Sequence, residues 1–599
     1  MNSGLSPSDP MLVAAFRSAL LHQGAIALLM LVFLWLLWAA ARTWWAAASP
    51  GTARASAAEP AEARARWLLR TGFGVLWIFD GILQAQPKMA GGLATQVMEP
   101  IAASSPGWVQ HLVNWGGTAW SYHPVQAGAA SVWIQVGIGT WLIVAVRGPW
   151  SRLAGAASVT WGLIVWVFGE SFGGIFAPGL SWLTGAPGAV LIYVVAGALI
   201  ALPEGAWRVP RTGRALLAGV GVFLAAMAVL QAWPGRGFWS GSARGKPGTL
   251  SRMVTEMAGT PQPHFLSSLL SGFASFATRY GFAVNLVVVI ALAAMGAAFL
   301  SGRPRLVRYA MWSGIVFCLA DWVLVQDLGF LGGLGTDPNS MIPLIVLFSA
   351  GYLALTPAAH EAEAPARTAE AKRPGVRSVA AAGALTVILL GAAPMAAAAV
   401  NRTADPILAL AISGNSTSLN LPAPGFSLTD QNGRTVSLAG LRGKVVLMTF
   451  LDPVCTSDCP IIAQEFKQTG QMLGAQAKNV ELVAVVANPT YRSTAFTRAF
   501  DRQEGLTTVP DWLYLTGSLS QLGAVWRHYG VAVENLPAGA MAAHNDLAVV
   551  IDPAGRIRQE LSSDPGPATS STRSSFSVLL GQYARQALRQ DARPALGQS

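Results

Sequence analysis

The sequence predicts a multi-domain protein, with an all-α polytopic membrane region followed by a C-terminal α/β domain. Hydrophobic residues make up 53% of the 599 residues and charged residues only 12%, whereas soluble proteins carry about 25% charged residues. Long apolar runs recur before residue 400. After residue 423 the pattern changes to short β-branched runs that alternate with amphipathic segments, which is typical of an α/β domain.

About ten segments are long and apolar enough for membrane spans, because a helix needs roughly 20 mostly apolar residues to cross a bilayer. These segments are 24–41, 67–87, 126–146, 154–172, 187–202, 214–233, 281–300, 309–326, 341–356 and 378–399.

Arginine residues gather in alternate loops between these segments. The formal charge of +11 does not indicate a nucleic-acid partner, because basic residues in short loops between apolar runs are typical of the cytoplasmic side of a membrane protein. The pattern predicts a multi-pass protein of a bacterial-type cell membrane, with its N-terminus and its C-terminal domain outside. A cleaved signal peptide in place of the first span would leave the Arg-bearing segment 42–66 outside, so we expect the span to be retained.

The membrane region contains an internal repeat. Residues 66–87 and 214–234 align at a shared LQAxP segment, and similar loops and helices follow each. We therefore predict two four-helix units, 64–203 and 210–356, in a parallel duplication. Each resembles the DoxX-like family, on the strength of the helix RTGFGVLWIFDGILQAQPK and the long loop after it. For some members the resemblance implies quinone or sulfur redox chemistry, so a quinone is a candidate cofactor.

The remaining segments connect these units. They are an N-terminal transmembrane helix with its cytoplasmic loop (1–63), a cytoplasmic linker (357–377), a transmembrane helix (378–399), an extracytoplasmic linker (400–422) and the α/β domain (423–590).

Acidic residues inside the predicted spans are candidate functional residues, because a charge in the bilayer is costly. Asp80, Asp321 and Glu170 qualify. They motivate a hypothesis in which the membrane region is a scaffold or a transporter. Cys318 lies in an apolar run and reads as a core residue.

The C-terminal domain reads as a thioredoxin-like arrangement of alternating strands and helices that ends in a hairpin. We expect strands at 443–451, 480–488, 511–517, 546–552 and 555–561, and helices at 459–473, 492–503, 518–530 and 574–589.

Cys455 and Cys459 occur in the segment LDPVCTSDCP, between a buried strand and a helix started by Pro460. A helix N-terminus favours the thiolate form, so a lowered pKa is expected for these thiols. The CxxxC spacing allows the two sulfurs either to close a disulfide or to bind one soft ion such as Cu(I). Three cysteines exclude a disulfide scaffold.

The domain closely resembles the Sco/SenC family over about 165 residues. The resemblance is carried by three segments: GKVVLMTFLDPVCTSDCP, YLTGSLSQLGAVWRHYGV and AHNDLAVVIDPAGRI. It implies copper binding, as Cu(I) and Cu(II), through Cys455, Cys459 and His544. It also implies a role in assembling the copper centre of cytochrome oxidase, with an oxidase subunit or another extracytoplasmic thiol or copper protein as partner.

A second function stays open beside copper delivery. The domain is then a thiol-disulfide oxidoreductase that exchanges electrons with membrane quinone through the DoxX-like region. The spans contain no cysteine pair for a thiol relay, which weighs against this function. A copper chaperone is therefore preferred over an enzyme.

Overall fold

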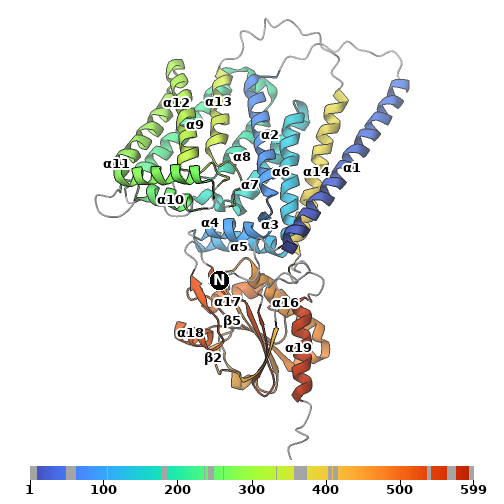
Figure 1. The fold of residues 1–599 in the computed structure, drawn as a ribbon. Coiled ribbons are helices and arrows are strands. Elements are labelled where there is room, and N and C mark those ends of the chain that lie inside the picture. The colour runs from blue at the N-terminus through green and yellow to red at the C-terminus, as the bar shows by residue number, and fades with distance from the viewer. Residues whose placement is uncertain are drawn as a thin grey trace, which may run out of the picture. The chain divides into compact units, whose positions relative to one another are not determined.

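The computed structural model (Figure 1) describes most of the chain in two compact units. Unit 1 comprises Met1–Leu20, Pro87–Gly128 and Pro394–Ser599, and unit 2 comprises Leu21–Gln86 and Ala129–Ala393. The described residues are 10–48, 62–103, 105–176, 185–234, 236–240, 248–260, 262–331, 334–355, 374–401, 408, 416–535, 541–562 and 575–591. The cytoplasmic loop around Arg54 and most of the cytoplasmic linker 357–377 fall outside these residues.

Each predicted span corresponds to a helix. These are α1 (Pro10–Ala48), α2 (Arg64–Gln84), α6 (Pro124–Val144), α7 (Gly148–Phe168), α8 (Ala189–Ile200), α9 (Pro210–Ala232), α11 (His264–Ser301), α12 (Pro304–Leu324), α13 (Met341–Leu355) and α14 (Pro374–Val400). Among the described residues, seven helices are long and apolar enough to cross a membrane. Helices α8 and α13 are shorter, and α2 carries Arg70 and Asp80. The count of ten spans stays a prediction.

Glycines bring two helix pairs of the helical region close together. A carbon added at Gly74 of α2 would lie 2.9 Å from the carbonyl oxygen of Gly139 in α6. The same 2.9 Å separates such a carbon at Gly221 of α9 from the carbonyl oxygen of Gly296 in α11. Gly74 and Gly221 stand at the same distance before their LQAxP segments. Small residues at such crossings allow helix backbones to approach closely.

Short helices occupy the segments that follow the two LQAxP elements. After the first come α3 (Met89–Gly92), a π-helical turn (Leu93–Met98), α4 (Glu99–Ala102) and α5 (Gly107–Tyr122). After the second comes α10 (Thr249–Ala258). These helices lie where the sequence predicts long loops.

The C-terminal domain is built on a mixed sheet, which has six strands among the described residues, in the order β1-β10-β9-β4-β5-β6. Strands β4, β5 and β6 are parallel, whereas β9, β10 and β1 each run antiparallel to the preceding neighbour. The strands are β1 (Ser416–Pro422), β4 (Val445–Leu451), β5 (Val480–Val486), β6 (Trp512–Leu515), β9 (Leu547–Ile551) and β10 (Arg556–Ser562). The predicted strands and the terminal hairpin are confirmed. The linker assignment was wrong at 416–422, because these residues pair with β10 as an edge strand.

Two further strand pairs and four helices complete the domain. The pairs are β2 (Ser427–Thr429) with β3 (Thr435–Ser437), and β7 (Val533–Asn535) with β8 (Ala542–His544). The helices are α16 (Asp458–Leu473), α17 (Thr494–Gln503), α18 (Leu519–His528) and α19 (Phe576–Asp591), close to the predicted positions.

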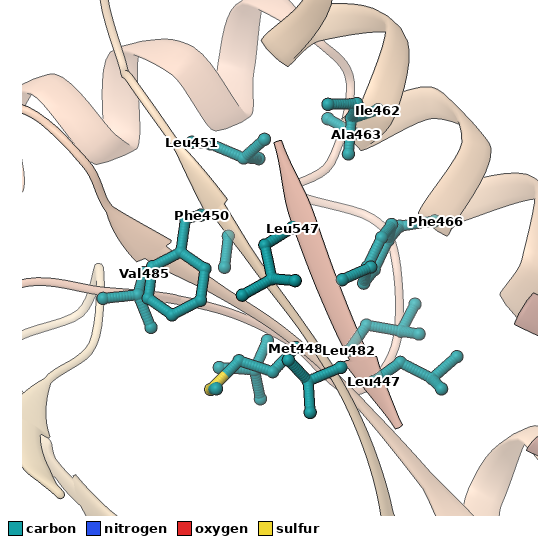
Figure 2. Packing of buried hydrophobic residues seen from close by; sticks show 14 of the residues in the cluster. Leu447, Met448, Phe450, Leu451, Ile462, Ala463, Phe466, Leu482, Val485 and Leu547 are labelled. Atoms are coloured by element: carbon teal, nitrogen blue, oxygen red, sulfur yellow. The ribbon is translucent and has the colours of Figure 1, made fainter. Parts of the chain in front are cut away.

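The core of the domain lies around its two central parallel strands. Every residue of β4 and of β5 is buried, as expected for parallel strands covered on both faces. Phe450 of β4 and Phe466 of α16 are fully buried within this core, together with Leu482 of β5 (Figure 2). Helices α16 and α19 contact each other, and α19 also contacts β4 and β9. This packing fixes the end of β4, from which the site begins.

Glu504 follows α17 and is fully buried, and neither carboxylate oxygen has a hydrogen-bond partner among the described residues. Burial raises its pKa from 4.5 to about 8. The folded state therefore holds a proton that the unfolded state loses above pH 4.5. Between pH 4.5 and about pH 8, the free energy of unfolding should therefore fall as the pH rises. Glu504 alone contributes up to about 1.4 kcal/mol per pH unit to this fall.

We expect Glu504→Gln to remove this pH dependence and to make the protein more stable than wild type at pH 9. Chemical denaturation of the full chain between pH 5 and pH 9 measures the effect. Glu534→Gln, at a position outside the core, is the control. An unchanged pH profile in Glu504→Gln would contradict the prediction.

Candidate metal and thiol site

Asp452, the first residue after β4, organises the edge of the sheet where the parallel strands end. Its side chain is fully buried. It accepts hydrogen bonds from the backbone N–H of Val454 (3.0 Å), from the backbone N–H of Ala542 (2.7 Å) and from the Asn488 amide (3.0 Å). Burial raises the Asp452 pKa to about 6, although these bonds and His544 oppose the rise. One carboxylate therefore connects the loop after β4, the end of β5 and the start of β8.

The two cysteines lie directly beyond Asp452. The backbone N–H of Cys455 donates to the Asp452 carbonyl at 3.1 Å. Cys459 lies in the first turn of α16, and its Sγ accepts from the backbone N–H of Asp452 at 3.3 Å. Cys455 is 5% exposed and Cys459 is 0% exposed. Both thiols thus lie buried at the junction between β4 and α16. The sequence predicted this strand–helix junction.

His544 is brought to the cysteines by β8. It pairs with Val533 of β7 and is buried. Its Nε2 lies 3.3 Å from Cys459 Sγ, and its Nδ1 lies 3.7 Å from a carboxylate oxygen of Asp546. A carboxylate beside the second ring nitrogen is the usual support of a metal-binding histidine, because it fixes the ring orientation. The structure therefore brings together Cys455, Cys459 and His544.

Asp458 is a further acidic residue at the site, which the sequence analysis did not single out. Its Oδ1 accepts from the Cys455 thiol at 3.3 Å, from the Ser457 hydroxyl at 2.7 Å and from the backbone N–H of Cys459 at 3.1 Å. The signal was present in the motif, since Asp458 directly precedes the second cysteine. Spacing alone does not show that its carboxylate turns toward the thiols.

The expected lowering of the thiol pKa is wrong for this arrangement. Burial raises the pKa of Cys459 well above the ordinary value of 9.0, and Cys455 and Asp458 raise it further. Burial also raises the pKa of Cys455, and a hydrogen bond with Cys459 opposes the rise only in part. Burial pushes the pKa of Asp458 upward, but His544 and the Ser457 hydroxyl outweigh it and the net pKa is lowered. The helix N-terminus is thus outweighed by burial and by nearby carboxylates.

The donor set fits a soft metal ion. The ligand atoms of Cys455, Asp458 and Cys459 all lie within 4.8 Å of one another. Two atoms bonded to one ion at roughly 2.3 Å cannot be more than about 4.6 Å apart, so small movements would let these three residues hold one ion. His544 lies outside this group of three, although its Nε2 is 3.3 Å from Cys459 Sγ. Thiolate and imidazole ligands suit copper. A cation would also compensate the charges of thiolates that the buried site otherwise disfavours.

The acidic candidates of the helical region lie in unit 2. Asp80 in α2 and Asp321 in α12 are buried, and the Glu170 carboxylate accepts from the backbone N–H of Val190 at 3.1 Å. Asp80 and Glu170 interact electrostatically with each other and with Asp337, which the sequence analysis missed. Asp321 interacts instead with Cys318. The structure thus associates Asp80 with Glu170 and leaves Asp321 apart from them.

Comparison with known proteins supports a Sco-type C-terminal domain. Residues 416–573 match the family model SCO1/SenC. No curated protein matches the chain.

Solved structures similar to the chain include ScoI of Bradyrhizobium japonicum with copper bound, at 22% identity over 28% of this chain and 98% of that chain, with a TM-score of 0.23. Yeast Sco1 with copper bound is 17% identical over 29% of this chain and 96% of that chain, with a TM-score of 0.24. BsSco, described as a member of the Sco family of cytochrome c oxidase assembly proteins, is 19% identical over 29% of this chain and 97% of that chain, with a TM-score of 0.25.

The raised thiol pKa values lead to a prediction for the metal-free protein. We expect alkylation of Cys455 and Cys459 to be slow at pH 7 and to keep accelerating above pH 9, because the thiolate is the reactive form. Asp458→Asn should move the rise to lower pH, since a repelling charge is lost. Mass spectrometry of iodoacetamide-treated protein measures the rates.

The matched control is Asp511→Asn, since Asp511 pairs with Lys444 at 2.9 Å instead of with the thiols. Its profile should equal that of wild type. An alkylation rate that reached half of its maximum at or below pH 7 in wild type would show that the thiol pKa values are low, which would contradict the prediction.

Proposed function

We propose that the C-terminal domain binds one copper ion through Cys455, Cys459 and His544 and acts in assembly of a cytochrome oxidase copper centre. The observation that carries this proposal is the approach of His544 Nε2 to Cys459 Sγ at 3.3 Å, with Cys455 Sγ within 4.8 Å of Cys459 Sγ and all three residues buried. The match of residues 416–573 to SCO1/SenC supports it. So do the copper-bound Sco structures and the oxidase-assembly role stated for BsSco.

Each ligand would bind the ion through one atom. Two thiolates and one imidazole can bind Cu(I) or Cu(II). Copper is then the cargo that an oxidase subunit would take up. Because both thiols are protonated at neutral pH, binding expels protons. The Asn545 carbonyl at 3.4 Å and the Asp546 carboxylate at 3.7 Å face the second ring nitrogen of His544, while Asp452 accepts hydrogen bonds from both the cysteine loop and the start of β8.

The proposed location follows from the sequence. The Arg-rich alternate loops support a multi-pass protein of the cell membrane with the C-terminal domain outside, where an oxidase subunit is accessible. The paired glycine crossings of α2 with α6 and of α9 with α11 support the proposed duplication into units 64–203 and 210–356. The DoxX-like assignment of these units rests on the sequence resemblance.

A thiol-disulfide function is the second candidate, and the proximity of the two thiols favours it, because the sulfur atoms of Cys455 and Cys459 lie within 4.8 Å of each other. Disulfide formation between them would release two protons and two electrons to an oxidant. In the reverse direction, a quinol bound in the membrane region would supply two electrons and two protons to the disulfide and leave as quinone, which is the direction that the sequence suggests. The hypothesis of a scaffold or transporter rests on Asp80, Glu170 and Asp321.

We expect the purified full chain to bind one Cu(I) per molecule. Cys455→Ser and Cys459→Ser should abolish binding, and His544→Ala should weaken it by at least about tenfold, roughly the loss of 1.4 kcal/mol. Competition with a chromophoric Cu(I) chelator measures the affinity, and thermal unfolding checks the fold. The control is His528→Ala, an exposed histidine of α18 that should leave binding unchanged. Unchanged affinity in His544→Ala would remove that residue from the site.

Reduction by quinol separates the two candidate functions. We oxidise the chain in membranes to the Cys455–Cys459 disulfide, add a reduced quinol without oxygen, and trap free thiols by alkylation. The copper-assembly proposal predicts no quinol-dependent thiols, whereas dithiothreitol should restore both. Quinol-dependent reduction that is lost in Asp80→Asn would instead establish the thiol-disulfide function.

A further inference from the structure

Helix α5 packs against the loop that carries the cysteines, within unit 1. The Ser121 hydroxyl donates to the carbonyl of Thr456, which lies between Cys455 and Cys459. The next residue, Tyr122, donates its hydroxyl to the Pro460 carbonyl at 3.4 Å. The last turn of α5 thus reaches the backbone of the CxxxCP segment at two points.

Two more polar contacts tie α5 to the helices of the α/β domain. The Gln464 amide of α16 donates to the Tyr122 hydroxyl at 3.2 Å and also to the Glu504 carbonyl at 2.7 Å. The Gln503 amide of α17 donates to the Thr118 hydroxyl at 2.9 Å. Thr118 and Tyr122 are fully buried. The face of α5 toward the domain therefore combines specific hydrogen bonds with the buried ring of Tyr122, which belongs to the hydrophobic core cluster of the domain.

Gly117 of α5 lies against Thr456 of the cysteine loop. A carbon added to Gly117 would lie 3.5 Å from Cβ of Thr456, which is ordinary van der Waals contact. Thr456 in turn directs its hydroxyl to Met541 Sδ at 3.7 Å, at the start of the segment that holds His544. One residue thus touches α5 on one side and the histidine segment on the other.

We infer that α5 is an internal docking partner of the thiol site and that its undocking controls access to Cys455 and Cys459. The thiols are buried while α5 lies on Thr456. A reagent, a metal donor or a client thiol reaches them when α5 moves away. An interface in which these four hydrogen bonds accompany one buried tyrosine suits such a reversible closure, because interfaces that open within a chain are more polar than permanent ones.

A second face of α5 contrasts with the docked one. His111 is exposed on the same helix, about 1.7 turns before Gly117 and about 120° round the helix axis from it. It supplies a matched control position, because a large side chain there leaves the contacts with Thr456 in place.

Docking is tested by a disulfide between α5 and the cysteine loop. In the full chain carrying Cys455→Ser and Cys459→Ser, Gly117→Cys with Thr456→Cys should cross-link within minutes under mild oxidation, because a Cβ separation of 3.5 Å lies within the disulfide range. Gly107→Cys with Thr456→Cys should not cross-link, since Gly107 lies ten residues earlier, about 15 Å along the helix. Equal cross-linking of both pairs would overturn the docking.

Control of access is tested by the alkylation rate of the native thiols. Gly117→Trp wedges α5 off Thr456, so we expect about a tenfold faster reaction of Cys455 in the full chain. His111→Trp should react at the wild-type rate. Ser121→Ala, which loses one hydrogen bond and retains the shape, should give a smaller acceleration of roughly twofold to fivefold. Unaltered rates in both Gly117→Trp and Ser121→Ala would refute the inference.

Two readouts keep this inference separate from the proposed function and from misfolding. Alkylation needs no copper, so failure of copper binding leaves the access test intact. A Gly117→Trp protein that unfolded would alkylate at the rate seen in denaturant, and the Ser121→Ala result then decides.

Discussion

The site depends on one buried carboxylate, that of Asp452 at the end of β4. It accepts hydrogen bonds from the cysteine loop, from Asn488 after β5 and from Ala542 at the start of β8. These three segments are distant in sequence, and without a shared acceptor each would leave a buried donor unsatisfied, at a cost of about 1–3 kcal/mol apiece. The carboxylate therefore fixes the positions of two sulfur atoms and one imidazole at the edge of the sheet.

The electrostatics of the site favour a bound cation over free thiolates. Two thiols, Asp452 and Asp458 share a volume from which water is excluded, and burial opposes the charged form of each. In the domain as described, His544 provides the countercharge that lowers the pKa of Asp458. A soft metal ion would reverse this balance, because a bound cation stabilises thiolate more strongly than a helix N-terminus does.

The sequence was sufficient where a local pattern determines structure, and insufficient where long-range pairing does. Continuous apolar runs predicted β4 and β5, and the residues around Pro460 predicted the start of α16. Strand β1 was predicted to be a linker because Ser, Thr, Asn and Pro make up most of it and only two leucines alternate with them. The positions of Cys455 and Cys459 followed from the motif. The pKa values did not, since they depend on burial and on Asp458, whose orientation arises from tertiary contacts.

The contact between the end of α14 and the end of α5 has a consequence for the strength of docking. The backbone carbonyl of Asn401 lies 3.3 Å from Nε2 of His123, the residue after α5. Leu408, only seven residues later, is buried in the hydrophobic core cluster of the domain. The domain is therefore confined near the end of α5 at a local concentration on the order of millimolar. A docking equilibrium with an intrinsic Kd of about 100 µM would then keep the thiols covered roughly nine-tenths of the time. Weak contacts thus suffice to keep α5 docked on the cysteine loop. A client protein can displace α5 if it binds the cysteine loop more tightly than α5 does.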